Sequence, residues 1–246
     1  MKRLYLILLR KELASAVHTS AAALVAAVVL SLSGFVAWLQ VLRLSDGRAA
    51  DGFWARPEPL FWLVLLLSAP LLTMHFFSEE RRTGELELRL AAPVSEACIV
   101  LSKYSAALLF WLLAWLPVLF YPLFFRLAGF PPGAAPRGAP VFYLGIQLLG
   151  ASFLAYGLFV SLLTRRPLVA AMLAVAPLAA LVALGMHPAP DALAFPPALR
   201  ATLSPVVHLR DFSTGVVDSR PVVAHLATAG LFLFLSTRLL EARRAA

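Results

Sequence analysis

Few side chains in this sequence could carry out chemistry of their own. The chain has one cysteine, Cys98, so an intramolecular disulfide is impossible and a cysteine-rich metal site is excluded. No stretch resembles G-x-x-x-x-G-K-[ST], the loop that holds nucleotide phosphates, and no H-E-x-x-H motif indicates a catalytic zinc ion. We therefore expect no catalytic residue, no metal and no cofactor in this chain, and we interpret Cys98 as a small packing residue.

Ser152 and His225 are the sharpest candidates for catalysis, since a serine and a histidine on two apolar segments could form the active site of a rhomboid-like intramembrane serine protease. Both local motifs fail. Phe153 follows Ser152 where a G-x-S-G turn has its second glycine, and Thr228 stands where the protease pattern places glycine. At a rise of about 1.5 Å per residue, Ser152 is expected roughly 16 Å below the outer end of its helix and His225 roughly 6 Å below its own. We therefore expect that the two side chains do not hydrogen-bond.

An ion-coupled secondary transporter is the second alternative, because ionisable groups near the middle of a membrane are costly and are retained mainly for function. Only His75 and His225 lie inside the apolar segments, and both lie near segment ends. Each is more simply explained as a histidine that is hydrogen-bonded at the membrane interface.

The overall composition is that of a membrane protein. Hydrophobic residues make up 61% of the chain and charged residues 14%, and the mean hydropathy is +0.85. Soluble domains have about 45–50% apolar and about 25% charged residues. The net charge of +8 comes from basic residues at the ends of apolar runs, so it indicates a membrane surface and no nucleic-acid partner.

Charge-free apolar runs predict a single all-α membrane domain over residues 1–246 with about six transmembrane helices, because about 20 apolar residues cross a bilayer. Prolines at positions 70, 117, 122 and 177 should kink these helices. An even number of spans puts both termini on one side of the membrane. The predicted spans are 21–42, 59–77, 104–125, 141–163, 167–186 and 222–237.

The distribution of basic residues sets the predicted orientation. With cytoplasmic termini, 13 of the 21 Lys and Arg residues fall inside, close to the helix ends, and eight fall outside. The segment 2–17 precedes the first span and is not followed by a cleavage site in the place a signal peptidase needs, so we expect an uncleaved interfacial helix. An amphipathic stretch is expected at 206–217, before the last span.

The cytoplasmic segment 78–103 is the most informative part of the chain. Leu86, Leu88 and Leu90 alternate with charged residues, which favours a strand by period, whereas Glu85 and Arg89 are spaced as a helical i,i+4 pair. The period alone does not decide between the two. Three leucines in a charged loop need a surface to bury against, either in their own chain or in a partner.

This segment resembles the loop after the second span of ABC-2 type permeases, which reads E-E-R-x-x-G-T-L-E-L-L-L-x-x-P-V-S and then G-K-Y. The departures are Glu85 for Thr, Arg89 for Leu and Ser102 for Gly. Similar stretches are 9–13 with 30–34, then 203–218 and 239–244, so the resemblance runs along the whole chain. Its nearest branch is the gliding-motility and nitrous-oxide-reductase maturation type of permease. The matching residues of the loop are Glu79, Glu80, Arg81, Gly84, Leu86, Glu87, Leu88, Leu90, Pro93, Val94, Ser95, Lys103 and Tyr104.

The resemblance implies a non-catalytic permease subunit of an ATP-driven ABC transporter in the bacterial inner membrane. ATP and Mg would be bound by a separate ATP-binding subunit in two copies, and a second transmembrane subunit, identical or related, would complete the membrane part. A periplasmic-domain protein is left open as a further partner, as is the choice between export and mechanical transmission. The implied coupling helix contacts the ATPase through Glu79, Glu80, Arg81, Arg82, Gly84, Glu85, Leu86, Leu88 and Leu90, and the interfacial helix meets the lipid through Arg3, Arg10 and Lys11.

Overall fold

The computed structural model describes residues 2–18, 20–45, 59–92, 94–129, 138–186 and 202–245, and within these ranges the chain is helical and contains no strand. The all-α prediction is therefore confirmed for this part of the chain. The elements are α1 (Lys2–His18), α2 (Ser20–Ser45), α3 (Pro59–Thr73), α4 (Ser78–Thr83), α5 (Glu85–Ala91), α6 (Glu96–Trp115), the 3-10 helix η1 (Leu116–Phe120), α7 (Tyr121–Leu127), α8 (Ala139–Leu163), α9 (Pro167–Met186), α11 (Pro205–Ser213) and α12 (Ser219–Ala245).

Five helical stretches of the described chain are long and apolar enough to cross a membrane, and they correspond to the last five predicted spans. The first predicted span, 21–42, falls within α2, whose apolar part Ala23–Leu39 is shorter than the other five. Five of the six predicted spans thus have a counterpart of full length. The five stretches are Pro59–Thr83, Glu96–Leu127, Ala139–Leu163, Pro167–Met186 and Ser219–Arg244.

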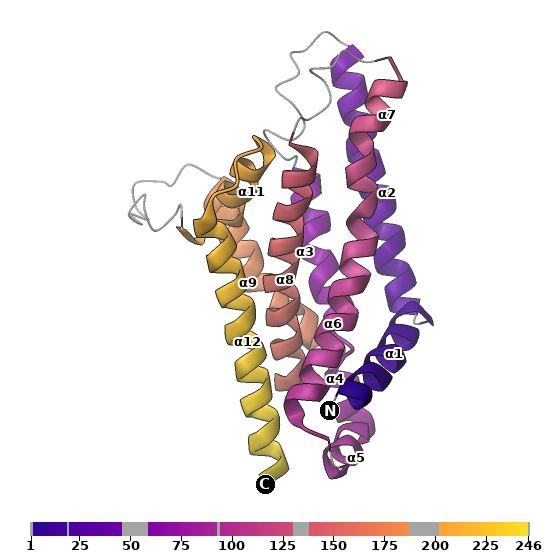
Figure 1. Ribbon diagram of the computed structural model, residues 1–246, viewed down its shortest axis with the longest axis vertical. Helices are drawn as coiled ribbons and strands as arrows, with labels where there is room; N and C mark the ends of the chain where they lie inside the picture. Colours follow the sequence, from indigo (N-terminus) through magenta and orange to yellow (C-terminus); the bar gives the residue numbers. More distant parts are fainter. Residues whose placement is uncertain are drawn as a thin grey trace.

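The helices form an elongated bundle in which both termini lie at the same end, together with α4 and α5 (Figure 1). We call this the terminal end, and α7 and α11 lie toward the opposite end. In its most apolar stretch α8 is 78% buried, whereas α12 is 17% buried. The centre of the bundle is therefore α8, and α12 lies on its periphery with much of its apolar surface uncovered.

Glycines on α8 allow other helices to approach it closely. A Cβ atom on Gly150 would lie 2.1 Å from Nε1 of Trp111 in α6, and one on Gly157 would lie 2.2 Å from Oγ1 of Thr73 in α3. Small residues at such crossings are typical of membrane helices, where packing has to replace the hydrophobic driving force. These two positions fix how closely α6 and α3 pack against the central helix.

The prolines act as predicted in the third span. Pro117 and Pro122 lie where α6 passes into the 3-10 helix η1 and then into α7, because proline has no N–H to continue the ladder. Pro70 and Pro177 instead remain inside α3 and α9.

The third span begins earlier than expected. Helix α6 starts at Glu96 and not at residue 104, so Cys98 and Lys103 belong to the helix and not to a loop. The prediction was too short because hydropathy stops at polar residues, whereas the helical hydrogen bonds continue through them. Elsewhere, α1 agrees with the helix expected at 2–17, and α11 overlaps the first part of the predicted amphipathic stretch.

Candidate functional site

The segment between the second and third spans folds into two short helices. Gly84 separates α4 from α5 and has a φ of 81°, in the left-handed region that favours glycine. The ambiguous period of the leucines is thereby decided in favour of a helix. Leu86 is 2% exposed, Leu88 is 76% exposed and Leu90 is half-buried.

Leu86 packs inside its own chain, in a cluster of buried side chains from α6, α8 and α12 that includes Ile99, Leu162 and Leu240. The implied contact of Leu86 with a partner is therefore revised, because a side chain buried at this level has no surface left to offer. The side chain of Leu88, in contrast, is exposed. The helix points these two leucines in different directions, which a strand would not have done.

Four charged side chains from four elements meet beneath this segment, and we call them the charge cluster: Glu12 of α1, Glu80 of α4, Arg89 of α5 and Lys103 of α6. Lys103 Nζ lies 3.1 Å from Glu12 Oε2 and 2.8 Å from Glu80 Oε1. Arg89 Nη1 lies 2.6 Å from Glu12 Oε1, and its Nη2 lies 2.9 Å from Glu80 Oε1. Each base thus bridges both acids, and the cluster ties α4 and α5 to α1 and α6.

The charge cluster is buried and formally neutral. Lys103 is 2% exposed, Glu12 is 5% and Glu80 is 7%. The ring centroid of Phe77 lies 5.3 Å from Lys103 Nζ, so the ammonium also meets an aromatic face. Burial raises the pKa of the Glu12 carboxyl, but Lys103 and Arg89 outweigh burial and hold this pKa below its ordinary value. The acid is therefore ionised at neutral pH, and the four charges balance.

The remaining predicted contact residues lie around the cluster. Glu79 accepts a hydrogen bond from Arg82 at 3.0 Å, and Arg81 Nη1 donates to the carbonyl oxygen of Leu162 at 2.6 Å. Glu80, expected to pair with a partner subunit, is instead engaged by bases of its own chain. In this part of the chain Arg82 and Glu85 are exposed and Arg81 is half-buried.

The predicted lipid-facing residues of α1 are only partly described. Arg10 and Lys11 are exposed, whereas the side chain of Arg3 lies outside the described residues. The sequence interpretation assigned no role to Glu12, although it is the one acidic residue among the bases of this segment, and that isolation was the available signal.

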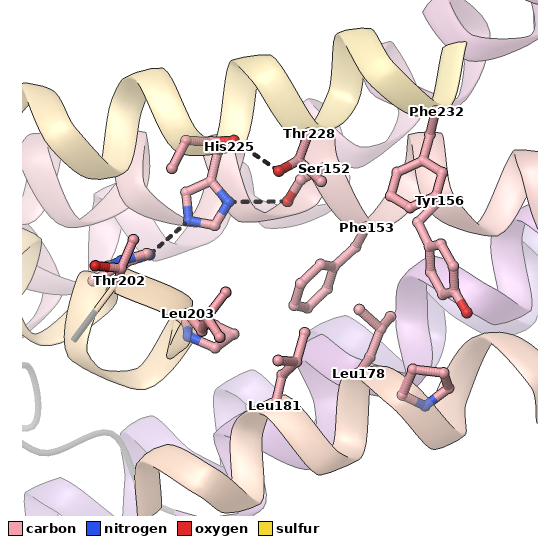
Figure 2. Close-up of a pocket in the computed structure, with 14 residues that line it drawn as sticks. Ser152, Phe153, Tyr156, Leu178, Leu181, Thr202, Leu203, His225, Thr228 and Phe232 are labelled. Carbon is pink, nitrogen blue, oxygen red and sulfur yellow. Dashed lines mark hydrogen bonds between the residues drawn. The ribbon is translucent and has the colours of Figure 1, made fainter. Parts of the chain in front are cut away.

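The expectation for Ser152 and His225 was wrong. Ser152 Oγ lies 3.0 Å from His225 Nδ1, and His225 Nε2 lies 3.2 Å from Nδ1 of His208 on α11 (Figure 2). The depth estimate assumed that the helices start at the same level, but α12 begins lower in the bundle than α8 (Figure 1). A histidine near the start of α12 therefore reaches a serine in the middle of α8.

This contact lacks the other parts of a hydrolytic site. Ser152 lies in the middle of α8, where backbone N–H groups donate to carbonyls four residues earlier, so no backbone donor beside it can stabilise an oxyanion. The residue that contacts the other ring nitrogen of His225 is a histidine, His208, and not the carboxylate of a catalytic triad. Within the described ranges, no three His, Cys, Asp or Glu side chains are grouped so that they could hold a metal ion.

Comparison with known proteins agrees with the loop motif and the helical bundle. No curated protein of similar sequence was found. A profile of the family described as ABC-2 family transporter protein matches residues 57–203, more than half of the chain, and its match includes the α4–α5 segment. With its apolar helices, this chain is a multi-pass membrane protein of the permease type and belongs to the ABC-2 family of transporter proteins.

Proposed function

We propose that this chain is the membrane-spanning permease subunit of an ATP-driven ABC exporter, in which α4 and α5 form the coupling segment that contacts a separate ATP-binding subunit. The charge cluster carries this proposal. It connects a surface-exposed segment at the terminal end to a buried lysine of the third span, through ion pairs of 2.6–3.1 Å. Movement of α4 and α5 would therefore shift α6 and α1 together.

In this proposal the terminal end is cytoplasmic and the protein lies in the bacterial inner membrane. Six crossings, with α2 as the first, account for both termini being at one end of the bundle (Figure 1). Two ATP-binding subunits bind ATP and Mg, and a second transmembrane subunit completes the pathway. The gliding-motility and nitrous-oxide-reductase maturation branch remains part of the proposal, with its periplasmic-domain partner and its choice between export and force transmission.

The exposed leucine of α5 provides the test. If Leu88 is buried against the ATP-binding subunit, its contact contributes about 1.5–3 kcal/mol, so Leu88→Glu should weaken the complex roughly ten- to hundredfold or more. The variant should insert and fold normally, because Leu88 has little contact with its own chain. The matched control is Val216→Glu, the same kind of change at a residue that is 58% exposed between α11 and α12.

Both variants are co-expressed with the proposed ATP-binding subunit, and co-purification and ATP hydrolysis are measured. We expect Leu88→Glu to lose the ATPase and Val216→Glu to retain it. Equal retention by both variants would refute α5 as the contact. Leu86→Glu should instead reduce the amount of folded protein because Leu86 is buried in its own chain.

A protease function remains the second candidate, because Ser152 and His225 are hydrogen-bonded. It predicts that a fluorophosphonate probe labels Ser152. We expect no labelling of the wild type and no loss of transport or ATPase coupling in Ser152→Ala.

A further inference from the structure

A cavity of about 330 Å³ lies between α8, α9, α11 and α12, away from the α4–α5 segment. Figure 2 shows Phe153, Leu178, Leu181 and Phe232 around it, with Ser152 and His225 on one wall. Ligand sites in proteins occupy about 300–1,000 Å³ and are mostly apolar with a few polar groups. This cavity is at the small end of that range, so it can hold one apolar chain but not a two-chain phospholipid.

The polar wall of the cavity has hydrogen-bond acceptors to spare. Ser152 Oγ lies 2.9 Å from the carbonyl oxygen of Leu149, to which it can donate, and 3.0 Å from Nδ1 of His225, to which it donates or from which it accepts according to the tautomer of His225. The hydroxyl of Thr228 donates to the carbonyl oxygen of Ala224 at 2.8 Å. Whichever tautomer His225 adopts, the hydroxyl oxygens of Ser152 and Thr228 each keep an unused lone pair. A ligand group that fits this wall is therefore a hydrogen-bond donor.

The charge of the ligand follows from the described residues that line the cavity, among which there is no Asp, Glu, Lys or Arg. Among these described side chains an ammonium group would find no carboxylate and a carboxylate would find no fixed cation, so either would be buried without a counter-charge from them. The N–H···N bond between His225 and His208 also requires one of the two facing nitrogens to be unprotonated. An uncharged hydroxyl group satisfies all of these conditions.

We propose that this cavity binds an uncharged amphipathic molecule of the membrane that has a single apolar chain and a hydroxyl group. The hydroxyl donates to Ser152 Oγ, and the chain lies against Phe153, Leu178 and Phe232. Leu203 lines the cavity and is 44% exposed, and in this proposal the ligand enters beside it. This site is separate from the coupling segment, and its test does not depend on the ATP-binding subunit.

Three photoreactive twelve-carbon probes with the same diazirine-bearing chain distinguish the head groups: an alcohol, a carboxylic acid and an amine. They are incubated with the purified chain in nanodiscs, and peptide mass spectrometry locates and quantifies the cross-links. We expect the alcohol to label residues of the cavity in a saturable way and unlabelled dodecanol to compete. Equal labelling by the three probes, or saturable labelling only elsewhere in the chain, would overturn the proposal.

Two variants test the geometry. Ser152→Ala removes one neutral hydrogen bond and should weaken saturable alcohol binding about fivefold. Ala224→Phe fills the cavity and should reduce labelling more than tenfold, whereas Leu226→Phe, two residues away at a site that is 55% exposed, should leave labelling unchanged. If Ala224→Phe does not fold, Leu181→Phe replaces it, with folding checked by thermal unfolding. Unchanged labelling in a folded cavity-filling variant would show that the ligand binds elsewhere.

Discussion

Replacing Lys103 with methionine should strongly destabilise the protein, and the geometry of the charge cluster sets the magnitude. The change leaves the carboxylates of Glu12 and Glu80 buried together with only Arg89 to balance them. Removing one partner from a buried ion pair costs about 3–5 kcal/mol. The folded variant can avoid the unbalanced charge by protonating one of the two carboxyl groups. At pH 7 this protonation itself costs about 3.7 kcal/mol for an ordinary glutamate pKa of about 4.3, and we take that value as the expected loss of stability.

The measurement is thermal unfolding of the purified protein in detergent. For a chain of this length, about 3.7 kcal/mol corresponds to a decrease in Tm of roughly 7–15 °C. The double variant Glu12→Gln with Lys103→Met restores the charge balance through the Glu80–Arg89 pair, so it should be more stable than Lys103→Met alone. As a control, Glu241→Gln removes one partner of an exposed pair with Arg238, and it should change stability by no more than about 1 kcal/mol. If the double variant lost the sum of the two single losses, the four residues would not act as one cluster.

The pH dependence of thermal stability shows whether Lys103→Met is destabilised by lost charge balance. In the wild type the pKa of Glu12 is lowered, so its stabilisation is present above the unfolded pKa of about 4.3 and is lost as the pH falls through the lower folded pKa. In Lys103→Met a carboxyl group must take up a proton on folding, so its folded pKa is raised and its penalty grows as the pH rises above about 4.3. The Tm difference between the two proteins should therefore shrink as the pH is lowered from 7 to 4. A difference independent of pH would indicate lost packing and not lost charge balance.

Three further predictions concern the packing, the coupling segment and the topology. Gly150→Ala places a Cβ atom against the indole of Trp111 and should destabilise the fold by about 1–3 kcal/mol, measured by thermal unfolding. Gly84→Ala puts a side chain at a φ of 81° and should cost about 1–2 kcal/mol, with a lower yield of the complex with the ATPase in co-purification. Cys98 should react with a membrane-impermeant maleimide in permeabilised cells but not in intact spheroplasts, and equal labelling in both would reverse the proposed orientation.

Much of the helical architecture could be predicted because it is a local property of the chain. Charge-free apolar runs predicted the last five spans, since a segment without charges is stable in hydrocarbon wherever its neighbours lie. The break at Pro117 likewise follows from the missing N–H of one residue. The loop motif E-E-R with G-K-Y-like residues indicated the family that the profile comparison then identified.

Local signals were less informative where a polar residue is stabilised by a distant partner. Lys103 was placed at the end of a loop because a lysine lowers the hydropathy of any window, yet in the structure it is a buried residue of α6. Glu12 and Glu80 neutralise it from two other elements. The ambiguity of Leu86 and Leu88 had the same origin, because only the surfaces packed against α5 distinguish its buried side from its exposed side.

By itself, therefore, the sequence determined the class of the protein and the last five of its predicted spans. The tertiary structure alone decided which of these parts meet. The charge cluster joins residues up to 91 positions apart, and the Ser152–His225 pair joins residues 73 positions apart. Such contacts depend on the relative level and tilt of packed helices, which periodicity and hydropathy do not encode, because both measure one element at a time.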